Sequence, residues 1–285
     1  SRSAQPALRS RRSLSRRVHI LSIVIFGLDV WRGLADRREA GGKHAHLACD
    51  AAHLVLAEVA PALVAHLDPE LLRGLLDPRP GLVPLGVRHA LDLIEPGDRV
   101  ADIFPGGGYW TRLFAVAVGE AGRVYPTIRA DGVAGEYETP VLEVAAQYPN
   151  ATMARTPYDA LAYPEPLDVI FTAQNYHDMP IAPYNLGDRA AMNASAFAAL
   201  KPGGIYVIID HAAVDGAAVQ TEDNEATLHR IDQATVRREV EAAGFVFDGE
   251  SAALRNASDS RTNSVFDPSI RGSTDQFLMR FRKPE

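Results

Sequence analysis

Cysteine is nearly absent from this chain. Cys49 is the single cysteine among 285 residues. One thiol excludes an internal disulfide framework, and it makes a zinc site built on cysteines implausible. Cys49 lies in an alanine-rich stretch for which a helix is predicted, and we expect a buried, inert thiol there. Three histidines of the same region are interpreted as surface residues, with metal ligation as the alternative: His44, His46 and His53.

The sequence also lacks an excess of positive charge. Its formal net charge is −7. Residues 1–43 hold ten Lys/Arg and three Asp/Glu, so the remainder carries 19 basic and 33 acidic residues. An acidic body has no clustered lysine and arginine to neutralise phosphates. We therefore expect a small-molecule partner and no nucleic acid, and a homodimer is left open.

No hydrophobic run is long enough to cross a bilayer. The apolar stretch 18–28 follows an Arg/Ser-rich segment and falls well short of the roughly 20 residues that a membrane helix needs. Residues 1–43 are interpreted as a basic flexible arm or weak targeting segment, with an export signal, an organellar transit peptide or a cloning artefact as alternatives. We expect no stable membrane insertion and a cytoplasmic location, or a periplasmic or exported one if this segment is a signal.

What the chain does contain is a regular alternation of strands and helices. Residues 44–86 are predicted to form a helical N-terminal extension and linker, and residues 87–285 form one domain. Because the last two predicted strands have no helix between them, they are expected to pair antiparallel. The predicted fold is α/β, a doubly wound, mostly parallel seven-stranded sheet with an antiparallel last strand. Its strands are 99–104, 123–127, 152–155, 167–173, 205–210, 245–247 and 276–282, and its helices are 87–94, 110–118, 140–148, 188–200 and 233–243.

The first predicted strand runs into three consecutive glycines before a helix begins. Gly106, Gly107 and Gly108 remove the side chains that would collide with a ligand, and Pro105 fixes one backbone angle. The helix that follows offers unpaired N–H groups at its N-terminus. A nucleotide-like ligand fits this geometry, although a plain tight turn is the alternative. A dinucleotide fingerprint is disfavoured because Thr111 stands where its third glycine belongs.

Three motifs, in this order, carry a resemblance to a known family. They are 102–108, Asp-Ile-Phe-Pro-Gly-Gly-Gly; 167–171, Leu-Asp-Val-Ile-Phe; and 200–204, Leu-Lys-Pro-Gly-Gly. Over residues 87–285 the chain resembles the class I S-adenosylmethionine-dependent methyltransferases, with Phe104 in place of the first glycine of their turn. The sequence 175–178, Asn-Tyr-His-Asp, and the tail 266–284 look like a bacterial subgroup of predicted methyltransferases. The resemblance implies a Rossmann-like methyltransferase fold and S-adenosyl-L-methionine as cofactor.

The resemblance also implies roles for particular residues. Gly106 and Gly108 would line the methionine and ribose part of the cofactor, and Asp102 would orient the turn or meet the cofactor's amino group through water. The family's ribose-binding acid at the end of the second strand is missing, so either Thr127 or Asp131 would substitute or ribose binding would be weakened. The rest of the expected cofactor set is Phe104, Gly107, Tyr109, Gln174 and Asn175, with Asp159 for the adenine beside Thr156, Pro157 and Tyr158.

Imidazoles and carboxylates follow the predicted strands at the edge where ligands of such sheets bind. His177 is the first candidate for a base that deprotonates the acceptor, oriented by Asp178 or Asp210, and His211 is the second. The alternative is that these histidines merely face solvent. A divalent metal on His177, Asp178, Asp210, His211 and His229 is a further alternative, but no metal is assigned. Loop residues would bind an anionic acceptor, close over the site or simply be solvated: Arg255, Asn256, Arg261 and Asn263.

These observations predict a transferase that moves a methyl group from S-adenosylmethionine to an oxygen or nitrogen of a small molecule. Histidine-assisted deprotonation of the acceptor is the expected mechanism. The alternative is a methyltransferase fold without methyl transfer, serving as a metal-dependent hydrolase-like enzyme or as a ligand-binding module. The missing acid of the second strand motivates that alternative.

Overall fold

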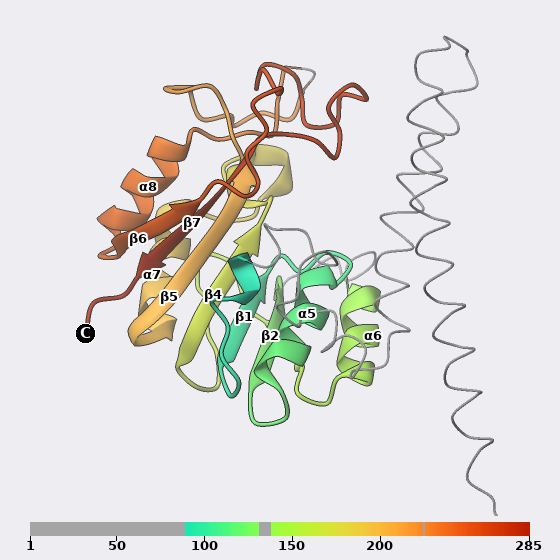
Figure 1. Ribbon diagram of the computed structural model, residues 1–285, viewed down its shortest axis with the longest axis vertical. Coiled ribbons are helices and arrows are strands. Elements are labelled where there is room, and N and C mark those ends of the chain that lie inside the picture. Colours follow the sequence, from blue (N-terminus) through green and yellow to red (C-terminus); the bar gives the residue numbers. More distant parts are fainter. Residues whose placement is uncertain (1–88, 131–137, 225) are drawn as a thin grey trace, which may run out of the picture. The chain divides into compact units, whose positions relative to one another are not determined.

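The computed structural model describes residues 89–130, 138–224 and 226–285 (Figure 1). The predictions for residues 1–43, for the helical extension 44–86, for Cys49 and for Asp131 lie outside the described residues. Within them, no helix is long and apolar enough to cross a membrane.

Seven strands form one mixed sheet in the order β3-β2-β1-β4-β5-β7-β6. Strands β1 to β5 pair in parallel, whereas β7 runs antiparallel to both β5 and β6. The predicted doubly wound sheet with a reversed last strand is therefore confirmed. The strands are β1 Arg99–Ile103, β2 Arg123–Ile128, β3 Ala154–Arg155, β4 Leu167–Ala173, β5 Leu200–His211, β6 Val246–Ser251 and β7 Gln276–Arg282.

Helices cover both faces of the sheet, and alternate strand residues bury against each layer. Val100 and Val169 pack into one cluster with α5 and α6, while Ala101 and Ile170 pack into the other with α7 and α8. Figure 1 shows the two helix pairs on opposite sides of the strands. Burial of both faces explains why the central strands read as continuous apolar runs. The helices are α5 Tyr109–Val118, α6 Glu138–Gln147, α7 Arg189–Ala199 and α8 Gln233–Ala242.

The segment 201–204, which separates the predicted helix 188–200 from the predicted strand 205–210, belongs to β5 instead. The pairing jumps from Leu167↔Leu200 to Val169↔Ile205, so a bulge absorbs the extra residues. The chain's tail holds this extension from the other side, because Gly203 N–H donates to the Lys283 carbonyl at 3.0 Å and Lys283 N–H donates to that of Gly204 at 2.9 Å. Hydrogen bonds to a distant segment thus convert a turn motif into strand.

Parallel pairing brings the carboxyl ends of β1, β2, β3, β4 and β5 to one edge of the sheet. The amino end of β7 reaches the same edge because β7 runs antiparallel. The loop between β6 and β7 therefore returns there too, and Figure 1 shows it beside the end of β5. This edge is where ligands of open α/β sheets bind.

Candidate cofactor and acceptor site

Residues 104–108, called the glycine turn below, leave β1 and enter α5 in a strained path. Phe104 has φ +59°, in the left-handed region that a bulky side chain rarely adopts. Its ring packs on Tyr158 with the centroids 3.9 Å apart, so an aromatic contact holds it there. Gly108 N–H closes the turn by donating to the Pro105 carbonyl at 2.7 Å. Strain of this kind, once observed, points to a functional site.

Two side chains of α5 form hydrogen bonds that hold the glycine turn and the strand end before it. The Thr111 hydroxyl donates to Asp102 Oδ2 at 2.6 Å, and Arg112 Nη1 donates to the Gly107 carbonyl at 2.7 Å. Burial raises the pKa of Asp102 to about 7, although the hydrogen bonds from Thr111 oppose this. Asp102 thus ties the end of β1 to the first turn of α5, and its role toward a cofactor stays a prediction.

The front of the glycine turn is open, whereas its last residue is tightly packed. A Cβ on Gly106 or Gly107 would meet no atom within 4 Å. A Cβ on Gly108 would lie 2.6 Å from Val144 Cγ2, so this glycine is required by packing against α6. Gly106 and Gly107 thus provide an open backbone surface at the N-terminus of α5. Tyr109 flanks it, and burial raises the pKa of its phenol.

The carboxyl end of β2 offers no carboxylate in the described residues. Thr127 is buried, and its hydroxyl donates to the Tyr125 carbonyl at 2.9 Å and lies 3.0 Å from the Tyr163 hydroxyl. It is therefore engaged with the protein rather than directed at open space. Beyond Ile128, Arg129 donates to the Tyr184 carbonyl at 3.0 Å. A ribose bound here would meet no acid from these residues.

The remaining predicted cofactor residues lie at the same edge but make contacts of their own. The Asp159 carboxylate packs against Gly187, where an added Cβ would lie 2.6 Å from Asp159 Oδ2. Gln174 has φ +63° and donates to Gln276 Oε1 at 3.1 Å. Asn175 Nδ2 donates to the Ala173 carbonyl at 2.6 Å. The role of these three residues in cofactor binding stays a prediction.

The second group of side chains at this edge, called the imidazole rim below, comprises His177, Asp178, Asp210, His211 and His229. The 3-10 turn η2, Tyr176–Asp178, places the first two. Tyr176 anchors this turn, since its buried hydroxyl donates to Glu239 Oε2 of α8 at 3.0 Å and accepts from Asn193 Nδ2 of α7 at 2.8 Å.

His177 has both ring nitrogens engaged by carboxylates. Nδ1 lies 2.7 Å from Asp210 Oδ1, Nε2 lies 3.0 Å from Asp178 Oδ1, and the backbone N–H donates to Asp210 Oδ2 at 2.9 Å. Burial opposes the charged ring most strongly, but the charges of Asp210 and Asp178 and their hydrogen bonds together raise the pKa of His177 to about 10. Both ring nitrogens of His177 are therefore occupied by carboxylates.

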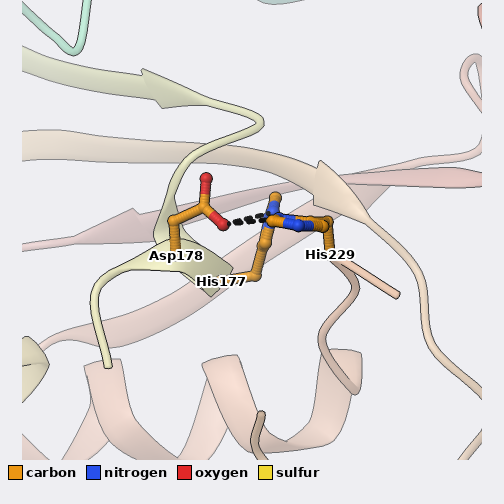
Figure 2. Close-up of side chains that lie close together, drawn as sticks. All are labelled: His177, Asp178 and His229. Carbon is orange, nitrogen blue, oxygen red and sulfur yellow. Dashed lines mark hydrogen bonds and ion pairs between the residues drawn. The ribbon is translucent and has the colours of Figure 1, made fainter. Parts of the chain in front are cut away.

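His229 completes a three-residue cluster with His177 and Asp178. Figure 2 shows the Asp178 carboxylate directed at both rings, and His229 Nδ1 lies 2.9 Å from the same Oδ1 that faces His177. Burial raises the pKa of Asp178, yet the two histidines lower it below its usual value overall. His229 itself has φ +55° and packs on the rings of Tyr184 and Phe266.

His211 differs from the other two histidines. Its Nδ1 lies 2.8 Å from the Thr274 hydroxyl, and its ring centroid lies 5.8 Å from that of His177. Burial lowers the pKa of His211 to about 4, which outweighs the opposing charge of Asp210. His211 is therefore neutral at pH 7.

The loop between β6 and β7 is fastened to the rim by a buried ion pair. Arg230 donates to both carboxylate oxygens of Asp259, at 2.8 and 3.3 Å, and to the Ala212 carbonyl at 3.0 Å. The loop arginines proposed for anion binding are used in the same way, because Arg255 and Arg261 both pair with Asp275. Asn256 donates to the Ser273 carbonyl, and Asn263 Nδ2 donates to Asp267. These contacts give the loop residues a structural role.

Comparison with solved structures decides the fold. No protein-family model matches the sequence, and no curated protein matches it significantly. The [4+2]-cyclase SpnF superposes with a TM-score of 0.51, at 17% identity, over 73% of this chain and 84% of its own. The chain has the class I methyltransferase fold. Two further structures with lower scores are a SAM-dependent methyltransferase from Aquifex aeolicus (0.49, 18% identity, 76% and 98% covered) and the N-methyltransferase NodS from Bradyrhizobium japonicum (0.46, 15% identity, 70% and 95% covered).

Two supporting side chains within this fold are not predicted from the sequence. Arg112, in the predicted helix 110–118, is buried and donates to the Gly107 carbonyl. Tyr163 lies in the loop before β4 and bonds Thr127. An arginine within the apolar run 110–118 was the available signal for the first. The second had none, because only the folded chain brings Tyr163 to the end of β2.

Proposed function

We propose that this protein transfers a methyl group from S-adenosylmethionine to an oxygen or nitrogen of a small-molecule acceptor. The observation that carries the proposal is the glycine turn. Arg112 holds its backbone by a hydrogen bond, and Gly106 and Gly107 leave open space where their side chains would be. The glycine turn lies at the sheet edge that also holds the imidazole rim. Gly106 and Gly107 would hold the cofactor beside the N-terminus of α5, where N–H groups point outward.

When bound, the cofactor would supply an electrophilic sulfonium methyl group for the acceptor. The protein's part is to position the acceptor and to take its proton. His211 is assigned the second task because its ring is neutral at pH 7, whereas both ring nitrogens of His177 are occupied by Asp178 and Asp210. With a pKa of about 4, His211 would take the proton as the new bond to the methyl carbon forms, when the acceptor has become acidic.

Titration calorimetry with S-adenosylhomocysteine tests the cofactor site. We expect saturable binding to the wild-type chain and a large loss of affinity in Gly106→Leu, whose side chain would project from the open face. Gly119→Leu is the matched control, because Gly119 also has positive φ and open surroundings but lies at the far end of α5. Absence of heat at millimolar ligand would overturn the proposal.

An acceptor screen with methyl-labelled cofactor tests the reaction itself. Once an acceptor is found, His211→Ala should lower kcat by about 10²- to 10⁴-fold, the usual contribution of a general base. Affinity for S-adenosylhomocysteine should stay unchanged. His89→Ala is the control, because His89 bonds Ser251 on β6. Equal rates in His211→Ala and wild type would remove His211 from the mechanism.

A second function is supported by the end of β2, where the described residues provide no acid for a ribose. In this alternative the fold serves as a metal-dependent hydrolase-like enzyme or as a ligand-binding module without methyl transfer. The name of SpnF, a cyclase, illustrates that this fold is not tied to one reaction. A negative titration with S-adenosylhomocysteine would favour this alternative.

A further inference from the structure

The cluster formed by His177, Asp178 and His229 is built around a position that needs a cation. Asp210 is a buried acceptor that lies 2.7 Å from His177 Nδ1, so that nitrogen carries a proton. If the imidazole is neutral, Nε2 then has no proton and is a hydrogen-bond acceptor, and it lies 3.0 Å from Asp178 Oδ1. Two acceptors at this separation repel unless a proton or a metal ion lies between them.

Two of the distances between ligand atoms of the cluster match those within a metal's coordination shell. Asp178 Oδ1 lies 3.0 Å from His177 Nε2 and 2.9 Å from His229 Nδ1, and all three residues offer ligand atoms within 4.8 Å of one another. Two ligands bound at right angles to a first-row ion, at about 2.1 Å each, lie about 3.0 Å apart. Two histidines and one carboxylate on one face of an ion form a recurrent site for such metals.

The surroundings of the cluster add the outer contacts that metal ligands require. Metal-bound histidines usually donate their second nitrogen to a carboxylate, and Asp210 accepts from His177 in this way. In the described part of the chain, Asp178 and Asp210 form their ion pairs with histidines rather than with lysine or arginine. The negative charge of these two carboxylates is thus left for a cation held by the rings.

We propose that His177, Asp178 and His229 bind one first-row divalent transition-metal ion, with Asp210 orienting His177. The protein supplies three ligands, so the other coordination positions are open to water or to an oxygen of the acceptor. The role toward the acceptor rests on the proposed methyl transfer, whereas the metal site itself does not.

Titration of the chelator-stripped, untagged full chain with Co²⁺ and Mn²⁺ tests the site. We expect one equivalent of either ion to bind, with ligand-field bands appearing in the visible spectrum of the cobalt form. Asp178→Asn and His229→Ala should abolish saturable binding. Asp210→Asn should weaken it by about 10- to 100-fold, the usual effect of removing a carboxylate behind a metal-bound histidine.

Controls separate loss of the site from loss of the fold. His89→Ala removes a histidine outside the rim and should bind the ion as wild type does. Circular dichroism must show each variant folded, and His229→Gln replaces His229→Ala if the latter is not. The proposal is overturned if no ion binds, in which case the cation is a proton. It is equally overturned if binding survives in both Asp178→Asn and a folded His229 variant.

The metal titration contains no S-adenosylhomocysteine, so its outcome is independent of the cofactor test. Metal binding together with a negative cofactor titration would leave the site standing and remove methyl transfer. Cofactor binding without metal binding would overturn the metal site and leave the proposed methyl transfer standing.

Discussion

The glycine turn and the imidazole rim lie at the same edge of the sheet but are constructed in opposite ways. In the turn, side chains such as Thr111 and Arg112 act from behind and leave the backbone of Gly106 and Gly107 open. In the rim, the side chains themselves converge, and His177 and Asp178 engage one another. A surface kept free suits a ligand that is recognised by shape, whereas a converging charged cluster suits a cation and proton transfer.

The largest expected change in stability concerns the buried ion pair between Arg230 and Asp259, which fastens the loop between β6 and β7. Arg230→Ala leaves Asp259 buried without its partner, and breaking a buried ion pair costs about 3–5 kcal/mol of unfolding free energy. Urea unfolding measures this loss. The double variant Arg230→Met/Asp259→Leu should recover part of it, because no unpaired charge then remains buried, while the Asp275 and Arg261 N–H groups lose their acceptor. If the double variant is as unstable as the single one, the pair does more than neutralise charge.

Asp102, at the end of β1 just before the glycine turn, should make the free energy of unfolding depend on pH. Asp102 has a pKa of about 7 when folded and an ordinary value of 3.8, so the folded state holds an extra proton between these values. The free energy of unfolding should therefore fall as pH rises from about 4 to 7, by at most about 1.4 kcal/mol per pH unit from this group. Asp102→Asn should flatten that slope, as measured by urea unfolding at pH 5, 6, 7 and 8. A slope that Asp102→Asn leaves unchanged would mean that Asp102 ionises normally in the folded protein. Asp92→Asn, at an exposed position, is the control and should keep the wild-type slope.

Much of the fold was predictable because its signals are local. The boundaries of β4 and β7 were predicted to the residue, since each is a short segment in which apolar and aromatic residues predominate. The start of β5 was misplaced, because the bulge between Leu200 and Ile205 depends on pairing with β4 and on the chain's tail. Lys201-Pro202-Gly203-Gly204 reads locally as a turn, and only distant partners make it strand.

For the site, the sequence predicts which segments come together but not which side chains contact one another. Parallel strands bring their carboxyl ends together, so the meeting of the segments that carry His177, Asp210 and His229 followed from the strand order. Which imidazole pairs with which carboxylate did not follow. The approach of His229 to Asp178 joins residues far apart in the chain, and Phe104 takes a left-handed backbone that its side chain disfavours.

A pair of substitutions in the glycine turn separates packing from ligand binding. Gly108→Ala combines a positive φ with a Cβ 2.6 Å from Val144 Cγ2, and it should lower the unfolding free energy by about 2–3 kcal/mol. Gly107→Ala meets no protein atom within 4 Å, so its stability should stay within about 0.5 kcal/mol of wild type. Its affinity for S-adenosylhomocysteine should nevertheless fall by at least about tenfold, because the new methyl group occupies ligand space. Calorimetry and thermal unfolding on both variants measure the contrast, and unchanged affinity in Gly107→Ala would place the ligand elsewhere.

The smallest expected effect lies at the end of β2, where a hydroxyl stands near the position of the family's ribose acid. The Thr127 hydroxyl is fully buried and is used by Tyr125 and Tyr163, so Thr127→Val should cost about 1 kcal/mol through the lost hydrogen bonds. Affinity for S-adenosylhomocysteine should change less than about twofold, because the fully buried Thr127 hydroxyl already donates its only proton to the Tyr125 carbonyl. A tenfold loss with unchanged stability would instead assign the ribose to Thr127. Retained affinity would mean that the open backbone of the glycine turn, rather than a side chain on β2, carries recognition of the cofactor.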